Sequence, residues 1–200
     1  MARQHFLLRP AAKPLLLIVL LLPLAYLVWG AVTLNLGANP AEHLIRSLGD
    51  WTLRLLLLTL AVTPLRQMSN LPQLARFRRM LGVTTFAYAC LHLLCYALFD
   101  KGLDVADIAR DIAKRPFILM GFAAWLLMLP LALTSFNKAI KALGAKRWQL
   151  LHRAVYAVAV VALLHFIWMR AGKQLFAEPA IYGAILAFLL GWRLLKRWRR

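Results

Sequence analysis

Six long apolar runs dominate the sequence and leave little choice of fold. A run of about 20 apolar residues is what an α-helix needs to cross the hydrocarbon core of a membrane. Hydrophobic residues make up 62% of the 200 residues and charged residues only 16%, which is typical of a multi-pass membrane protein. We predict an all-α membrane protein, a bundle of six transmembrane helices in one domain (1–200), with spans at about 14–36, 51–68, 80–99, 116–136, 148–169 and 179–195.

The segments between and before the spans predict a retained N-terminal helix and two loops. The basic leader 1–13 followed by an uncharged run resembles a signal peptide, but no convincing small-x-small cleavage site follows Trp29, so we expect a retained helix. Residues 35–50 hold Gly, Asn and Pro in breaker positions and predict a loop, and the basic stretch 137–147 predicts a second one. We find no internal repeat.

The basic residues indicate the orientation of the spans. Of the 25 Lys and Arg, 16 lie in the N-terminus, the loops after spans two and four, and the C-terminus. All seven acidic residues lie on the opposite side. By the positive-inside rule both termini are cytoplasmic. The net charge of +18 therefore reflects topology and gives no reason to expect nucleic-acid binding.

A short amphipathic helix is predicted between spans three and four. On a helical wheel, four carboxylates share one face and apolar residues lie opposite. The acidic face comprises Asp100, Asp104, Asp107 and Asp111, and the apolar face Val105, Ile108, Ala109 and Ile112. We interpret the acidic face as solvated surface in preference to a partner-docking patch.

Three histidines lie within or at the ends of apolar spans, and they are the candidate functional residues. Ionisable side chains are costly in a membrane, so His92, His152 and His165 are candidates for function, and His is a common axial ligand of haem iron. Cys90 and Cys95 form neither CxxCH nor a zinc spacing, which leaves non-covalent b-type haem. The alternative is that these histidines serve packing or proton transfer.

The predicted topology indicates how deep in the membrane each of these histidines lies. Spans three and five cross in the same direction, with His92 about 12 Å and His165 about 8 Å from their outer ends, so one haem held by both is predicted. His152 would lie roughly 20 Å deeper along span five, where a second haem would complete a path across the membrane. A second ligand on span three, opposite His152, would be expected fourteen residues before His92. That position holds Arg78, which is a poor iron ligand but could bind a haem propionate.

Several segments resemble one known family. They are RRMLG (78–82), YACLHLLCY (88–96), KRP (114–116), LALTS (131–135), LGAKRWQLLHRAVY (143–156) and LLHFIW (163–168). In these segments and in its six-span plan the chain is similar to the MsrQ family, also called YedZ, of the ferric-reductase-like transmembrane superfamily. The resemblance covers nearly the whole chain.

The resemblance implies a function. Members of the family are haem-binding membrane subunits that pass electrons through b haem, with FMN also assigned, to MsrP, a periplasmic molybdopterin reductase that repairs methionine sulfoxide in oxidised proteins. By position, His92, His152 and His165 are the family's haem histidines. The superfamily usually has a histidine where this chain has Arg78, which leaves one or two haems open. No FMN-binding residue transfers from the motifs.

The donor, the acceptor and the class of activity stay open at this level. Only a few residues follow span six, too few for a flavin domain, so the electron donor is expected to be quinol or a separate cytoplasmic flavin reductase. The outer loops are too short for an enzyme active site, so catalysis is expected on the partner. The alternatives are a transmembrane ferric or other metal reductase, and a non-redox transporter or scaffold.

Overall fold

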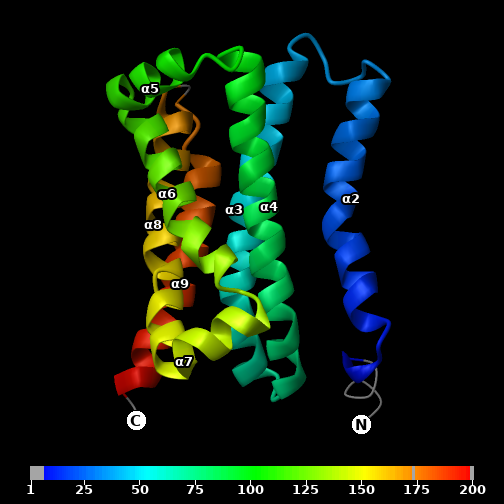
Figure 1. Ribbon diagram of the computed structural model, residues 1–200, viewed down its shortest axis with the longest axis vertical. Helices are drawn as coiled ribbons and strands as arrows, with labels where there is room; N and C mark the ends of the chain where they lie inside the picture. Colours follow the sequence, from blue (N-terminus) through cyan, green and yellow to red (C-terminus); the bar gives the residue numbers. More distant parts are fainter. Residues whose placement is uncertain (1–6, 173, 199–200) are drawn as a thin grey trace. The chain divides into compact units, whose positions relative to one another are not determined.

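The computed structural model describes residues 7–172 and 174–198, and within these ranges the regular structure is helical, with no strand. The chain divides into two compact units, Met1–Gly102 and Leu103–Arg200, which we describe one at a time. Six helical stretches are long and apolar enough to span a membrane, three in each unit (Figure 1). The predicted all-α fold with six spans is therefore confirmed.

The first unit is built on two neighbouring helices, α3 (Pro40–Met68) and α4 (Arg78–Cys95), with α2 (Ala12–Val32) beside them. Its buried core repeats every seven residues, at Leu20 and Leu27, at Leu48, Leu55 and Val62, and at Leu81 and Tyr88. A seven-residue spacing keeps one stripe of each helix facing its neighbour. A 3-10 segment, η1 (Pro72–Phe77), leads into α4, and a π-helical turn, η2 (Tyr96–Asp100), follows it.

The second unit pairs α6 (Pro116–Leu133) with α8 (Val155–Ala171), and α9 (Ala177–Trp198) packs against α8. Two further helices complete it: the short α5 (Val105–Lys114), which contacts α6, and α7 (Asn137–His152), which runs crosswise to α8 (Figure 1). Leu119, Leu126, Ile181 and Phe188 are exposed on these helices. Exposed apolar side chains on helices of this length are the surface that a membrane protein presents to lipid.

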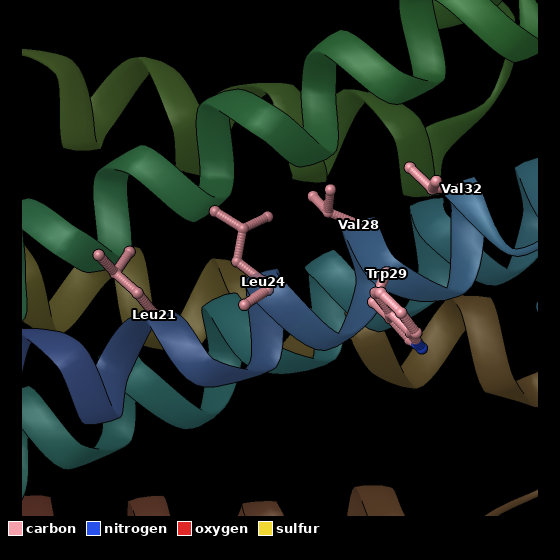
Figure 2. A pocket seen from close by; sticks show the side chains of 6 residues that line it. Leu21, Leu24, Val28, Trp29 and Val32 are labelled. Atoms are coloured by element: carbon pink, nitrogen blue, oxygen red, sulfur yellow. The ribbon is translucent and has the colours of Figure 1, made fainter.

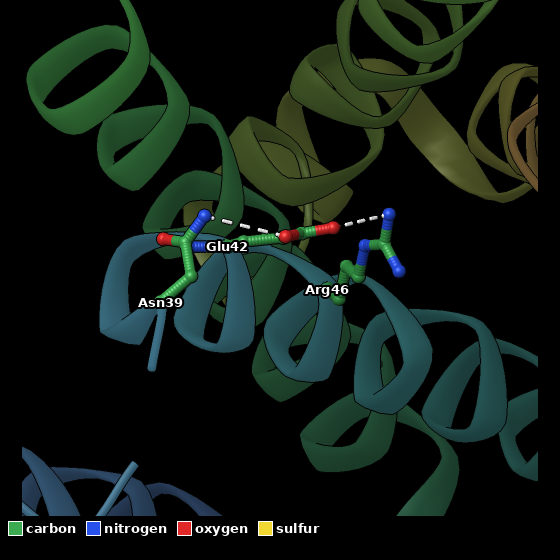
Figure 3. A network of polar contacts seen from close by, with 3 residues as sticks. All are labelled: Asn39, Glu42 and Arg46. Carbon is green, nitrogen blue, oxygen red and sulfur yellow. Dashed lines mark hydrogen bonds and ion pairs between the residues drawn. The ribbon is translucent and has the colours of Figure 1, made fainter. Parts of the chain in front are cut away.

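The expected loop at 35–50 is wrong for most of its length, because α3 begins at Pro40. Asn39 caps the helix by accepting a hydrogen bond from the Glu42 backbone N–H (3.1 Å), and its amide group donates to the Glu42 carboxylate (3.3 Å). Glu42 also forms an ion pair with Arg46 (Figure 3). Asn at the cap, Pro at the first helical position and Glu two residues later start a helix, so these residues initiate α3 where we had expected a break.

The expected loop at 137–147 is also wrong, since α7 covers it. Gly144 has non-helical backbone angles (φ 72°, ψ 158°), so α7 consists of two helical segments joined at a kink there. The expected continuous span 148–169 is interrupted instead at Arg153 and Ala154, whose N–H groups bond to the carbonyls three residues earlier. These tighter turns separate α7 from α8, so His152 and His165 do not lie on one continuous helix as predicted.

The amphipathic helix exists as α5, but its faces are not arranged as expected. Asp111, which we had placed on a solvated face, is buried and forms an ion pair with Arg115 (Nε to Oδ1, 2.9 Å). Val105, from the apolar face, is 78% exposed. This arrangement suits a helix at a membrane surface, where apolar side chains can point outward to lipid and the buried carboxylate is paired with an arginine at the surface.

Asp104 caps α5, and we expect this cap to depend on pH. Hydrogen bonds from the backbone N–H groups of Asp107 (3.0 Å) and Ala106 (2.9 Å) hold the pKa of the Asp104 carboxyl below its ordinary value of 3.8. Because the folded pKa is the lower one, the contribution of the cap is complete above pH 3.8 and is lost as the pH falls through the folded pKa.

Amide hydrogen exchange of the first turn of α5 measures this effect. Asp104→Ala is expected to exchange faster at neutral pH, whereas Asp104→Asn keeps a capping side chain and stays close to the natural protein. Only the natural protein should lose protection on acidification, because asparagine does not titrate. The same acid-dependent loss in the asparagine variant would contradict this assignment.

Candidate functional site

His92 in the first unit is fixed to the backbone of the neighbouring helix. Its Nδ1 lies 2.8 Å from the carbonyl oxygen of Ile45 on α3. Its ring lies over Gly49, one turn further along α3, so closely that a Cβ added there would be 3.1 Å from the ring atom Cε1. The imidazole is therefore held by one hydrogen bond and one close packing contact from α3.

His165 in the second unit is held in the same way by a different pair of helices. Its Nδ1 lies 2.6 Å from the carbonyl oxygen of Phe117 on α6. Its ring lies over Gly121, where an added Cβ would be 2.9 Å from Cε1 and 3.0 Å from Nδ1. Each unit thus presents one histidine on one span, anchored to a carbonyl and a glycine of the preceding span.

This anchoring determines which ring nitrogen can ligate a metal. A carbonyl oxygen only accepts hydrogen bonds, so Nδ1 of His92 and of His165 must carry the proton. In the neutral ring the lone pair then lies on Nε2, and metal-ligating histidines are usually oriented by a bond of this kind from their other nitrogen. Both residues therefore fit the requirements of axial ligands of haem iron.

His152 has different surroundings, all of them in the second unit. Its Nε2 lies 3.1 Å from the Thr134 hydroxyl, and its ring stacks on Trp148 at 4.0 Å between centroids. The Thr134 hydroxyl lies 2.6 Å from the Pro130 carbonyl and donates its one proton there, so it accepts from Nε2–H of His152. In this arrangement His152 carries its proton on Nε2, whereas His92 and His165 carry theirs on Nδ1.

Trp148 and His152 also fasten α7 to the end of α6. The indole Nε1 of Trp148 donates to the Thr134 carbonyl (2.9 Å), next to the hydroxyl that holds His152. These two side chains, one turn apart on α7, therefore both bond to Thr134, the residue that caps the C-terminal end of α6. His152 thus has a structural role in addition to its predicted one as a ligand.

Arg78 is the first residue of α4 and is exposed. It shares one continuous helix with His92, and fourteen residues of helix place it roughly 21 Å away along the axis on nearly the same face. Its interaction with a propionate stays a prediction.

An apolar groove of about 440 Å³ runs along α2, lined by Leu21, Leu24, Ala25, Val28, Trp29 and Val32 (Figure 2). Among the side chains of these residues only the indole N–H of Trp29 is polar. The groove is suited to apolar contact such as a lipid chain, and it contains no side chain able to ligate iron.

The histidine anchors could not be read from the sequence because they join residues far apart in it. Ile45 and His92 are 47 positions apart, and Phe117 and His165 are 48 apart. The available signal was a glycine at a similar distance before each histidine, Gly49 by 43 residues and Gly121 by 44, although Gly49 fell in the segment predicted as a loop.

The fold and these side chains define a class, namely a helical multi-pass membrane protein with histidines on its apolar helices, two of them with Nδ1 bonded to a backbone carbonyl. Comparison with known families agrees, since residues 48–163 match the ferric reductase like transmembrane component. No solved structure matches the chain.

Similar proteins with assigned names identify the family more closely. A protein of Polaromonas naphthalenivorans (strain CJ2) is 62% identical over 198 residues, covering 99% of this chain and 90% of the relative. One from Azospira oryzae is 53% identical, covering 94% and 81%, and one from Xanthomonas axonopodis pv. citri is 44% identical, covering 94% and 87%. Each is named protein-methionine-sulfoxide reductase heme-binding subunit MsrQ. The chain belongs to the MsrQ family.

Proposed function

We propose that this protein is a haem b electron-transfer subunit of the bacterial inner membrane. It takes electrons from the quinone pool or from a cytoplasmic flavin reductase and passes them to a periplasmic molybdopterin reductase of the MsrP type, which repairs methionine sulfoxide in oxidised proteins. The catalytic site is on that partner. The observation that carries the proposal is the identical anchoring of His92 and His165 in a chain of the MsrQ family.

His92 and His165 are the proposed ligands of the haem iron. Bound haem supplies a one-electron carrier. The protein fixes each imidazole by its Nδ1–H bond to a backbone carbonyl, so that Nε2 is directed by the scaffold and needs little reorganisation when it ligates. Ligation of one iron by both is the pairing that the parallel directions of spans three and five predict.

The proposed orientation follows the basic residues, with both termini in the cytoplasm. In the second unit, the helix α7 then lies at the cytoplasmic surface with Lys138, Lys141, Lys146 and Arg147 exposed on it. Such a helix suits the headgroups of anionic lipid and an acidic surface of a soluble donor.

The number of haems and the presence of FMN are further parts of the proposal. His152 is the candidate ligand of a second haem, which requires its Nε2 to give up the bond to Thr134. Arg78 is the candidate contact for a propionate. FMN is implied by the family resemblance alone, and no residue is assigned to it.

The test is the visible spectrum of the protein purified in detergent, oxidised and then reduced with dithionite. A pyridine haemochrome assay gives haem per protein, and the fluorescence of released flavin tests FMN. We expect a low-spin b-type spectrum, and reoxidation of the reduced haem when an MsrP-type partner and methionine sulfoxide are added. Reoxidation by ferric chelates but not by that partner would favour a metal reductase, and a colourless protein after expression with added haem would favour a transporter or scaffold.

Replacing His152 by alanine separates its two candidate roles. We expect the low-spin spectrum assigned to His92 and His165 to persist, because His152 contacts Thr134 and Trp148 and neither of their anchors. The haem content of the same sample then gives the count. A fall from two haems to one per protein would assign the second haem to His152, whereas loss of the whole low-spin signal would contradict the prediction.

A further inference from the structure

Gly49 and Gly121 occupy matching places in the two units, and their position explains how the histidine anchors are possible. In each case the glycine follows the anchoring carbonyl by four residues, Ile45 to Gly49 and Phe117 to Gly121. Both lie inside long helices, α3 and α6, where glycine is less stable than alanine. Neither has the positive φ that would require glycine for its backbone.

The carbonyl of a helical residue is normally covered by the side chain four positions later. Side chains in an α-helix lean toward the N-terminus, over the preceding turn. This chain shows the effect directly, because the hydroxyls of Thr52, Thr59 and Thr85 each reach the carbonyl four residues before them. A carbonyl oxygen has a second lone pair beyond the one used by the helix, and a bulky ring from another helix can approach it more closely where that covering side chain is missing.

Gly49 and Gly121 leave that second lone pair open to an imidazole. A Cβ at Gly121 would be 2.9 Å from Cε1, 3.0 Å from Nδ1 and 3.2 Å from Nε2 of His165, and a Cβ at Gly49 would be 3.1, 3.3 and 3.6 Å from the same atoms of His92. The contact below 3.0 Å at Gly121 would force the ring of His165 to move, and the contact of 3.1 Å at Gly49 would displace the ring of His92 by a few tenths of an ångström. Either displacement weakens the bond that holds the proton on Nδ1 and the lone pair on Nε2.

We propose that Gly49 and Gly121 are positioning residues for the haem ligands: each exposes a helix carbonyl to which His92 or His165 donates its Nδ1–H, and so sets the tautomer and direction of the ligating imidazole. This inference rests on the proposed haem function. Glycine is required at these two places by the neighbouring ring, and its role is independent of backbone flexibility.

The experiment compares Gly49→Ala and Gly121→Ala with two control substitutions of helical glycines. Gly82 lies on the same helix as His92 and has its nearest neighbour at 3.8 Å, and Gly191 on α9 has none within 4 Å. We expect Gly121→Ala to weaken haem binding roughly 10- to 100-fold and to convert remaining haem to a high-spin form, as for other residues that orient metal ligands. Gly49→Ala should have a smaller effect of the same kind, since its contact is longer, and Gly82→Ala and Gly191→Ala should keep the natural spectrum.

A second measurement does not depend on haem. The ¹⁵N shifts of the histidine rings in haem-depleted natural protein report which nitrogen carries the proton. The proposal requires the Nδ1–H form for His92 and His165, and a change of that form in the corresponding alanine variants. Natural spectra and unchanged ring shifts in both glycine variants would overturn it.

These readouts also separate the two proposals. If the natural protein binds no haem, the electron-transfer proposal fails, and the ring shifts alone decide the positioning role. If haem binds normally but the shifts show Nε2–H in both histidines, the positioning role fails and the haem function stands. A variant that does not fold is recognised by its circular dichroism, and the natural protein's ring shifts still decide the case.

Discussion

Replacing either His92 or His165 with alanine is expected to abolish the low-spin b-type haem spectrum. Low-spin haem of this type needs two strong axial ligands, and each substitution removes one imidazole whose Nε2 the scaffold directs. The remaining haem should become five-coordinate and high-spin, or be lost during purification. Optical and electron paramagnetic resonance spectra, normalised to protein, measure the change.

A matched control lies on α3. His43 is exposed near the start of the same helix that anchors His92, and we assign it no ligand role. His43→Ala should therefore keep the full spectrum. Added imidazole should restore part of the low-spin signal in His165→Ala, since a free ligand can enter the vacated place. A full low-spin signal in both His92→Ala and His165→Ala would contradict the assignment of this pair.

The six spans could be predicted because hydropathy is a strong local signal. A long uncharged run has few other stable conformations, so each predicted span corresponds to a helical stretch in the structure, with an interruption in the fifth. The errors lie at the ends, where weaker signals decide. Asn39, Pro40 and Glu42 start α3 in a segment whose Gly and Pro content predicted a loop, which shows that the order of such residues matters more than their number.

The faces of α5 illustrate a second kind of error. The helical wheel correctly separated carboxylates from apolar residues, but it cannot say which side meets the protein. Asp111 is buried because Arg115, one turn later, neutralises it, and Val105 is exposed on the side that a membrane would cover. Amphipathicity read from a sequence therefore gives two faces without assigning them in a membrane protein.

The candidate site was predictable only in part. Three histidines in apolar surroundings stand out in any membrane sequence, because placing an ionisable side chain in a membrane costs free energy and usually serves a function. The three histidines differ from one another in their tertiary hydrogen bonds. The carbonyls of Ile45 and Phe117 hold two of the rings, and the hydroxyl of Thr134 holds the third. A single sequence gives no information on such pairs, since each partner is an ordinary residue of another helix.

Replacing Tyr88 with alanine is expected to cause the largest loss of stability in the first unit. Tyr88 is 1% exposed and belongs to the core shared by α2, α3 and α4. Its hydroxyl donates to the Leu20 carbonyl (2.8 Å) and accepts from the Leu24 N–H (3.1 Å), so it bridges one turn of α2 next to Pro23. Proline interrupts the hydrogen bonds of a helix, and a hydroxyl from α4 at that turn stabilises it.

Two substitutions separate the ring from the hydroxyl. Tyr88→Ala removes both and should lower the free energy of unfolding by about 3–5 kcal/mol, the usual cost of deleting a buried aromatic ring. Tyr88→Phe keeps the ring and should cost about 1–3 kcal/mol, the range for losing a buried hydrogen-bond partner. Unfolding in mixed micelles with increasing dodecyl sulfate, followed by circular dichroism, measures both. If the phenylalanine variant were as stable as the natural protein, the backbone of α2 would satisfy itself around Pro23, and the hydroxyl of Tyr88 would add no stability to the attachment of α2.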